Sequence, residues 1–183
     1  GRYTDDIQPA GTLHGYVLRS PNAKATFRIV STEAARQAPG VVLVLTGADL
    51  GDLKDLKTPY AAKQPDGSTP DLEGIPLLCR DRVAHVGDAV AFVVAGTRAQ
   101  AQDAAELIEI EYEAEAAAAD TATALDEDTP LVWPQRGTNR ALRYELGDAA
   151  ATAAAFAKAS RVTRITFTNN RLVCNYMEPR AAV

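Results

Sequence analysis

Residues 82–95 have the sequence RVAHVGDAVAFVVA, the strongest strand pattern in this chain of 183 residues. Small and β-branched apolar residues dominate it, which is the composition of strands packed in a core. Gly87 and Asp88 interrupt the run between residues 83–86 and 89–94. A Gly-Asp pair inside a strand pattern predicts either a tight turn or a β-bulge at this point.

Three more strands and a helix are predicted on the N-terminal side of this run. Residues 13–18 end at a Ser-Pro-Asn turn signal, and residues 25–29 alternate apolar and polar side chains. Residues 32–38 predict a short helix that ends at a Pro-Gly pair. Residues 41–45, VVLVL, are continuously apolar and too few for a helix, so we expect a buried strand there.

On the C-terminal side the sequence predicts a helix followed by a strand. Thr97 and Gln100 have the spacing of a capping box, in which each side chain satisfies a backbone amide of the other's turn. The helix that follows places small and aliphatic residues on one face: Ala101, Ala104, Ala105 and Ile108. Residues 108–113 then alternate apolar and acidic residues, which predicts a strand with one solvated face. Strands and helices without a regular β-α-β repeat favour an α+β fold over a doubly wound sheet.

Residues 51–76 break the pattern with four prolines and few large apolar side chains. Structureless loops of about 25 residues are uncommon in domains and are usually functional or disordered. We give equal weight to an arm that contacts a partner and to a mobile loop.

An acidic, alanine-rich connector at residues 116–130 is the best internal boundary. Beyond it the sequence predicts a helix at 149–159, capped by a Gly-Asp pair, and an alternating strand at 162–168. We therefore expect a first domain at 1–115 and an incomplete second one at 131–183.

Composition excludes several classes of protein. The net charge of −5 and the scattered Lys and Arg residues argue against a nucleic-acid partner and against an anionic membrane surface. No stretch approaches the roughly 20 apolar residues of a membrane span. Cys79 and Cys174 are too few for a disulfide framework, and we expect two buried free thiols in a soluble, cytoplasmic protein.

The sequence contains no phosphate-binding glycine loop, no nucleophile elbow and no metal-ligand cluster. His14 and His85 each lie in a strand pattern, where a structural role is expected, and nothing in the spacing supports a Cys-His nucleophile pair. We expect the remaining paired carboxylates to be solvated: Asp5 and Asp6, and Glu109, Glu111 and Glu113. No catalytic residue and no metal ligand is assigned.

The last residues, 175–183, have the sequence NYMEPRAAV. Glu178 lies between Met177 and Pro179, so we expect a buried carboxylate that pairs with Arg180 or Arg171. The apolar tail resembles a strand begun and not completed, and this predicts that the chain is part of a longer protein.

Segments along nearly the whole chain, in order, resemble the large subunit of the molybdenum hydroxylases, the family of xanthine dehydrogenase, aldehyde oxidoreductase and aerobic carbon monoxide dehydrogenase. Near the start these are GRYTDDI (1–7), LHG (13–15) and RSPNA (19–23). In the middle they are PGV (39–41), LTGADL (45–50), VGDAVA (86–91), TRAQA (97–101) and IEYE (110–113). Near the end they are NRL (170–172) and MEPRAAV (177–183).

The resemblance implies an α/β-hammerhead domain at residues 1–115, followed by the first helix and strand of a molybdopterin-binding region. It implies a parent enzyme that hydroxylates a heterocycle or aldehyde carbon with oxygen from water. Such an enzyme uses molybdenum on molybdopterin and passes electrons to [2Fe-2S] clusters and FAD on companion subunits or domains. The catalytic Glu and the pterin-binding loops of relatives lie downstream of Val183, so this part is expected to be inactive alone. Glu178 and Arg180 are the cofactor-binding candidates at the junction.

Two other functions remain open. The chain can be a stand-alone scaffold or interaction protein built on a hammerhead domain, without chemistry of its own. It can also be an unrelated small enzyme that uses Glu178 and Arg180.

Overall fold

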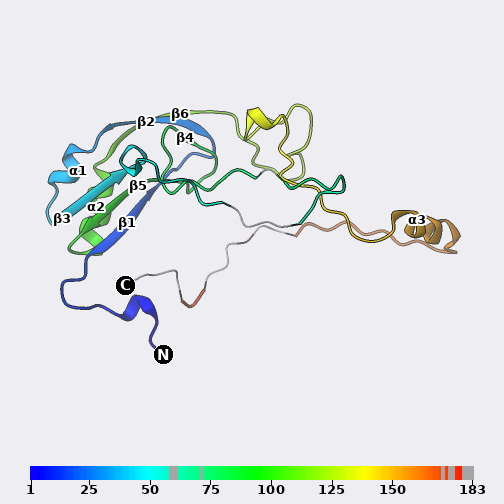
Figure 1. Ribbon diagram of the computed structural model, residues 1–183, viewed down its shortest axis with the longest axis horizontal. Coiled ribbons are helices and arrows are strands. Elements are labelled where there is room, and N and C mark those ends of the chain that lie inside the picture. Colours follow the sequence, from blue (N-terminus) through cyan, green and yellow to red (C-terminus); the bar gives the residue numbers. More distant parts are fainter. Residues whose placement is uncertain (58–61, 71, 170–171, 173–175, 179–183) are drawn as a thin grey trace. The chain divides into compact units, whose positions relative to one another are not determined.

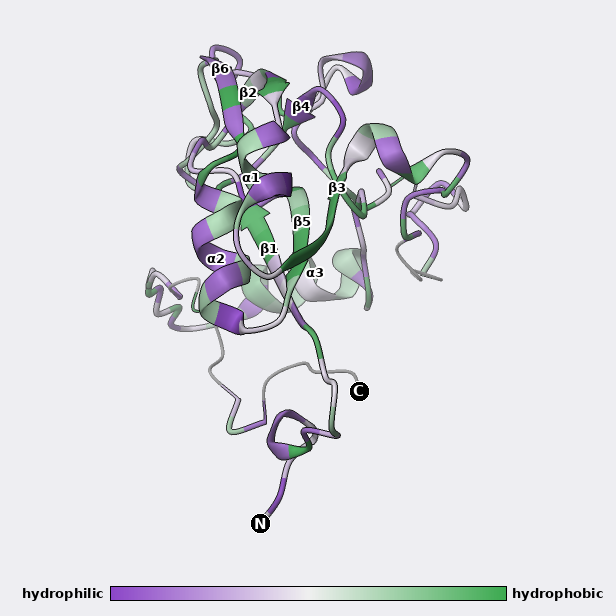
Figure 2. Cartoon of the chain, turned by 90° about the vertical axis from the view of Figure 1, so that its left-hand side faces the viewer, coloured by the Kyte–Doolittle hydropathy of each residue, from purple (hydrophilic) through white to green (hydrophobic). Residues whose placement is uncertain are grey.

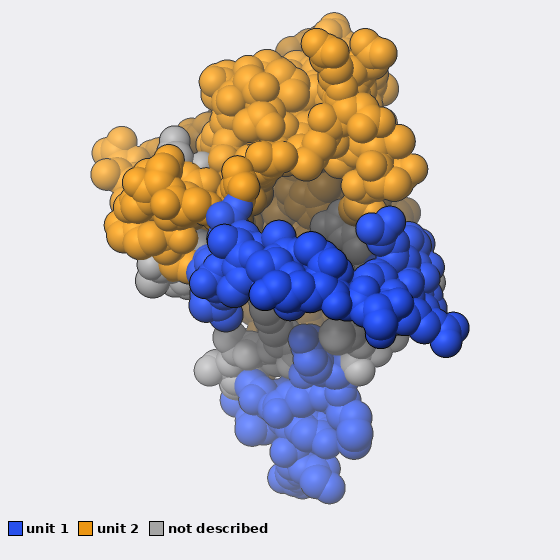
Figure 3. Space-filling view, turned by 90° about the vertical axis from the view of Figure 1, so that its right-hand side faces the viewer, with its two compact units in different colours: residues 1–11, 144–183 blue, residues 12–143 orange. Residues whose placement is uncertain are grey.

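The computed structural model describes residues 1–57, 62–70, 72–169, 172 and 176–178. The chain divides into two compact units, which Figure 3 shows in different colours. One unit is Thr12–Arg143, and the other combines Gly1–Gly11 with Tyr144–Val183. Each is described by itself.

The first sheet of the unit Thr12–Arg143 is antiparallel, with the strand order β1-β5-β3 (Figure 1). Its strands are β1 (His14–Arg19), β3 (Val41–Thr46) and β5 (Ala89–Ala95). The predicted strand run therefore supplies the central strand. Figure 2 shows the hydrophobic colour concentrated on these strands beside α1 and α2.

The second sheet is also antiparallel and has the order β4-β2-β6. Its strands are β2 (Ala25–Ser31), β4 (Arg82–Val83) and β6 (Glu109–Ala114). Phe27 of β2 lies opposite Tyr112 of β6, with ring centroids 5.7 Å apart. Such cross-strand aromatic pairs are a common source of sheet stability.

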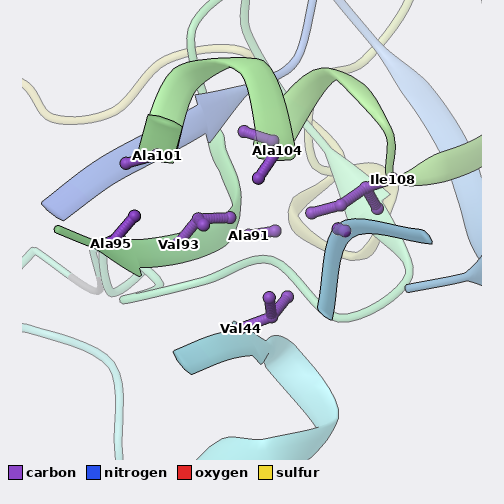
Figure 4. Packing of buried hydrophobic residues seen from close by; sticks show 9 residues of the cluster. Val44, Ala91, Val93, Ala95, Ala101, Ala104 and Ile108 are labelled. Atoms are coloured by element: carbon purple, nitrogen blue, oxygen red, sulfur yellow. The ribbon is translucent and has the colours of Figure 1, made fainter. Parts of the chain in front are cut away.

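Two short helices cover the first sheet: α1 (Glu33–Gln37) and α2 (Arg98–Glu106). The alanine face of α2 packs on β1 and β5, and Figure 4 shows how its Ala101 and Ala104 face Val93 and Ala95 of β5. The Thr97 hydroxyl accepts a hydrogen bond from Gln100 N at 3.2 Å, which confirms the Thr97 half of the predicted capping box. The Gln100 side chain lies against Gly40.

The remaining described elements are short, and three of them are 3₁₀ turns: η1 (Thr4–Asp6), η2 (Gly47–Leu50) and η3 (Pro134–Arg136). The last is α3 (Ala149–Lys158), whose cap is Asp148 as predicted, with Ala151 N donating to its Oδ1 at 2.8 Å. None of the helices in the described part of the chain combines the length and apolar content needed to span a bilayer.

The structure confirms the predicted mixed α and β class, with two antiparallel sheets and few helices. Gly87-Asp88 forms a tight turn, and this turn connects strands of different sheets, since β4 belongs to the second sheet and β5 to the first. Gly87 has φ of 99°, a conformation that favours glycine. The first strand of the pair is shorter than predicted, because residues beyond Val83 already belong to the turn.

Two strand predictions were wrong in part or whole. We expected residues 41–45 to be buried, but β3 lies at the edge of its sheet and Val42 is 62% exposed. Residues 162–168, although they alternate, are not a strand in the structure, and Ile165 and Phe167 are 82% and 79% exposed. Alternation alone does not make a strand without a neighbour to complete its hydrogen bonds.

Residues 51–76 have little regular structure in their described part, as predicted. Leu56 and Ile75 exchange two backbone hydrogen bonds of 2.8 Å, which close the base of the loop. The division into domains at 115 and 131 stays a prediction.

The close packing of α2 on the sheet generates the first prediction. Ala104 is fully buried against β5, whereas Ala99 on the same helix is exposed. Ala104→Leu should lower the free energy of unfolding by about 1–3 kcal/mol, because added methylenes overpack the interface. Ala99→Leu should change it by less than about 0.5 kcal/mol. Urea unfolding measures both, and equal effects would show that α2 is not packed as described.

Candidate functional site

The candidate site is a cleft of about 540 Å³ in the unit Thr12–Arg143. Three stretches line it: the two ends of the 51–76 loop, the segment that crosses from one sheet to the other, and residues after the acidic connector. Its charged and aromatic lining residues are Asp55, Glu73, Arg80, Asp81, Arg82, His85, Asp88, Trp133 and Arg136.

Asp88 is the buried carboxylate of this cleft. Its Oδ2 accepts hydrogen bonds from Ala84 N at 2.6 Å and from His85 N at 3.2 Å. His85 Nδ1 lies 2.8 Å from Asp88 Oδ1, while the His85 side chain is largely exposed. Asp88 therefore fixes the turn between β4 and β5 and orients the imidazole toward it.

Cys79 lies next to the same turn, since its N donates to Ala89 O at 2.7 Å, and it is buried. Burial, and next the negative charge of Asp88, raise the pKa of its thiol to about 12. The thiol is thus protonated at neutral pH and is a poor nucleophile, because the thiolate is the reactive form. The buried free thiol predicted for Cys79 is confirmed, and Cys174 lies outside the described residues.

The guanidinium groups around the cleft are held by nearby acceptors. Arg80 donates to Gly51 O at 3.0 Å, Arg136 to Ala141 O at 3.1 Å, and Arg82 pairs with Glu115 at 2.7 Å. Carboxylates and guanidiniums lie around the same cleft, so it lacks the single-sign field that attracts a polyanion.

The structure does not bring the two histidines together. His14 pairs with Ala95 at the far end of β5, whereas His85 binds Asp88 just before that strand begins. Three carboxylates of β6 are exposed as predicted: Glu109, Glu111 and Glu113. Arg28 pairs with Glu111 across the sheet surface at 2.5 Å, a type of contact that adds little stability.

Glu178 is exposed, contrary to the expected buried carboxylate. Within its own unit it accepts from Thr4 N and Thr4 Oγ1, both at 3.5 Å. Arg180 and Arg171, its expected partners, lie outside the described residues. The described residues also hold no group of three or more His, Cys, Asp or Glu side chains placed to bind a metal ion.

Sequence reasoning missed Asp88 as a structural carboxylate, although a local signal existed. An Asp in a turn commonly accepts hydrogen bonds from nearby backbone amides, and the Gly-Asp pair already predicted the turn. It also missed Lys24 and Asn139, whose most distant hydrogen-bond partners lie 107 and 15 residues away along the chain. No local pattern reports such pairings.

Comparison with known proteins gives a consistent set of matches. Residues 1–116 match the family model described as aldehyde oxidase and xanthine dehydrogenase, a/b hammerhead domain. The carbon monoxide dehydrogenase large chain of Afipia carboxidovorans is 34% identical over 184 residues, which cover 94% of this chain and 22% of that protein. The nicotine 6-hydroxylase large subunit of Paenarthrobacter nicotinovorans is 40% identical over 114 residues, which cover 62% and 13%.

A solved structure agrees with the sequence matches. The Cu,Mo-CO dehydrogenase in its carbon monoxide reduced state superimposes with a TM-score of 0.69 at 32% identity, over 88% of this chain and 21% of that one. The chain thus spans about a fifth or less of the length of these relatives.

The role of Asp88 is testable by stability. Asp88→Ala leaves the amides of Ala84 and His85 without their acceptor, so the free energy of unfolding should fall by about 2–3 kcal/mol. Asp81→Ala, at an exposed carboxylate next to the same strand, is the matched control and should change little. Equal losses in urea unfolding would contradict the assigned role.

The protonated state of Cys79 predicts its reactivity. In a Cys174→Ser variant, alkylation of native Cys79 should be slow at pH 8 and rise about tenfold per pH unit to pH 10, because the thiolate fraction is still growing below a pKa of about 12. The unfolded thiol, with an ordinary pKa of about 8.5, should level off in this range. A native plateau near pH 9 would contradict the burial of this thiol.

Proposed function

Because the chain belongs to the aldehyde oxidase and xanthine dehydrogenase family through its hammerhead domain, we propose that it is the N-terminal structural portion of a molybdenum hydroxylase large subunit and is not catalytic alone. The observation that carries this proposal is the pattern of coverage. The match extends over 94% of this chain but over only 22% of the carbon monoxide dehydrogenase large chain.

The proposed division of the chain follows from the same resemblance. Residues 1–115 form the hammerhead domain, 116–130 a connector, and 131–183 the start of a molybdopterin-binding domain. The end of the family match at residue 116 supports the first boundary.

The exposed apolar surface after residue 143 supports the assignment to an incomplete domain. Helix α3 has no buried residue, and its Phe156 is exposed. Ile165 and Phe167 are more exposed still. Large exposed apolar side chains gathered in one stretch are typical of surfaces that another part of a protein covers. We propose that the remainder of the large subunit covers them.

The proposed parent enzyme hydroxylates a heterocycle or an aldehyde using water, with molybdenum on molybdopterin. In such an enzyme molybdopterin carries the metal, and this chain covers only 22% of the carbon monoxide dehydrogenase large chain. Two cysteines also cannot ligate two [2Fe-2S] clusters, which use Cys₄ sets. We therefore propose that the pterin site lies in the remainder of the subunit, and that the clusters and FAD lie on companion subunits or domains.

Glu178 and Arg180 remain the proposed contacts toward the cofactor-binding region. The exposure of Glu178 leaves its carboxylate accessible to such a contact. No step of the reaction is assigned to either residue.

Metal content tests the proposal. The chain purified alone should carry no stoichiometric molybdenum and should reduce no dye with aldehyde or N-heterocycle substrates. The same residues within the complete large subunit, produced with its companion subunits, should carry both molybdenum and activity. Stoichiometric molybdenum on the chain alone would contradict the proposal.

The reading frame separates this proposal from the stand-alone scaffold. Continuation past Val183 into glycine-rich pterin-binding sequence is the expected result. A stop codon directly after Val183 would favour the scaffold instead.

A further inference from the structure

Lys24 is a nearly buried cation with two partners that lie far apart in the sequence. Its side chain is 9% exposed, and its Nζ lies 2.9 Å from Glu115 Oε2 and donates to Leu131 O at 3.0 Å. A buried ammonium group is tolerated when such partners replace its water. The two partners are the residues that flank the acidic connector 116–130 on either side. We propose that Lys24 is a clasp that closes residues 115–131 into a fixed loop and thereby sets one wall of the cleft.

The first end of this loop is held by side chain and backbone together. Glu115 N donates to Lys24 O at 2.9 Å, directly after β6. The Glu115 carboxylate bridges two cations, because its other oxygen lies 2.7 Å from the guanidinium of Arg82 in β4. The hydrogen bond from Lys24, with the charge of Arg82, lowers the pKa of Glu115, so the carboxylate is ionised at neutral pH.

The second end of the loop is held by the side chain of Asn139, which binds three backbone groups. Asn139 Oδ1 accepts from Val132 N at 2.8 Å, and its Nδ2 donates to Ala124 O at 2.9 Å and to Pro130 O at 3.0 Å. Thr129 Oγ1 also donates to Thr123 O at 2.6 Å. The connector is thus a folded loop with its own polar contacts, as in compact surface loops whose ends meet.

The position of the loop 115–131 matters because the residues that follow it line the cleft. Trp133 and Arg136 lie within five residues after Leu131 and line the same cleft as Arg80 and His85. Gln135 Nε2 donates to Glu73 Oε1 at 3.2 Å, and this hydrogen bond connects the wall to the 51–76 loop. The bond from Lys24 to Leu131 O is thus one of the contacts that hold this wall, and its loss loosens the wall on the side of the connector.

Lys24 can be removed without leaving a new unpaired charge. Glu115 keeps Arg82 as its partner, so Lys24→Met removes both bonds of the clasp while the carboxylate remains paired. Met also keeps a long flexible side chain in the same space. Lys54→Met, at an exposed lysine, is the matched control.

Two measurements on the full chain report the loop directly. Trp133 is the single tryptophan of the chain, so its quenching by acrylamide reports exposure of the wall. Cleavage at Glu127 by a Glu-specific protease, followed by mass spectrometry, reports opening of the loop. Lys24→Met should speed cleavage at Glu127 on the order of tenfold, as expected for loss of a hydrogen bond from a charged donor, and should increase quenching of Trp133. Lys54→Met should match the unmodified chain in both.

Unchanged cleavage and quenching in a folded Lys24→Met variant would overturn the proposal. Should that variant lose its far-UV circular dichroism, Glu115→Gln decides instead, since it keeps the side-chain shape and removes the negative charge that Lys24 shares with Arg82. Faster cleavage at Glu127 in Glu115→Gln supports the clasp, and an unchanged rate overturns it. The result is independent of the proposed function, which metal content tests.

Discussion

The alternating faces of β5 are the constraint on which the rest of the unit Thr12–Arg143 depends. Ala91, Val93 and Ala95 point into the cluster beneath α2, whereas Val90 belongs to a second cluster with Phe27 and Cys79. One strand therefore builds two cores, because successive side chains of a strand face opposite ways. The small alanines on β5 and on α2 let the helix approach closely, and no polar group has to be buried between them.

This constraint explains why much of the fold was predictable from sequence. The periods of α2, β5 and β6 are local properties, and each of these elements was found where its pattern predicted it. The exposure of Val42 was not predictable, because the order of strands decides which strand lies at an edge. The strand expected at 162–168 failed for a related reason, since its pattern requires a partner that the described residues do not provide.

In the candidate site, too, the local interactions were predictable from the sequence and the distant ones were not. Asp88 acts within its own turn, so the Gly-Asp signal led close to it. Lys24 acts on residues at both ends of a connector, and only the folded chain brings them together. The predicted burial of Glu178 was wrong, because its apolar neighbour Met177 is itself 84% exposed and does not cover the carboxylate. Flanking residues do not determine the environment of a carboxylate.

The polar groups that line the cleft have structural roles, and they already take part in holding the fold. The Cys79 thiol is buried with a pKa of about 12, and Asp88 holds His85. The guanidinium groups of Arg80 and Arg136 are hydrogen-bonded to backbone carbonyls. Catalytic groups are usually poised near the working pH and directed at a substrate. A domain whose polar residues hold its own turns and loops is suited to present a defined surface, which agrees with the proposal that the reacting groups of the parent enzyme lie elsewhere. That division of labour is consistent with a chain that matches its relatives closely while spanning about a fifth of their length.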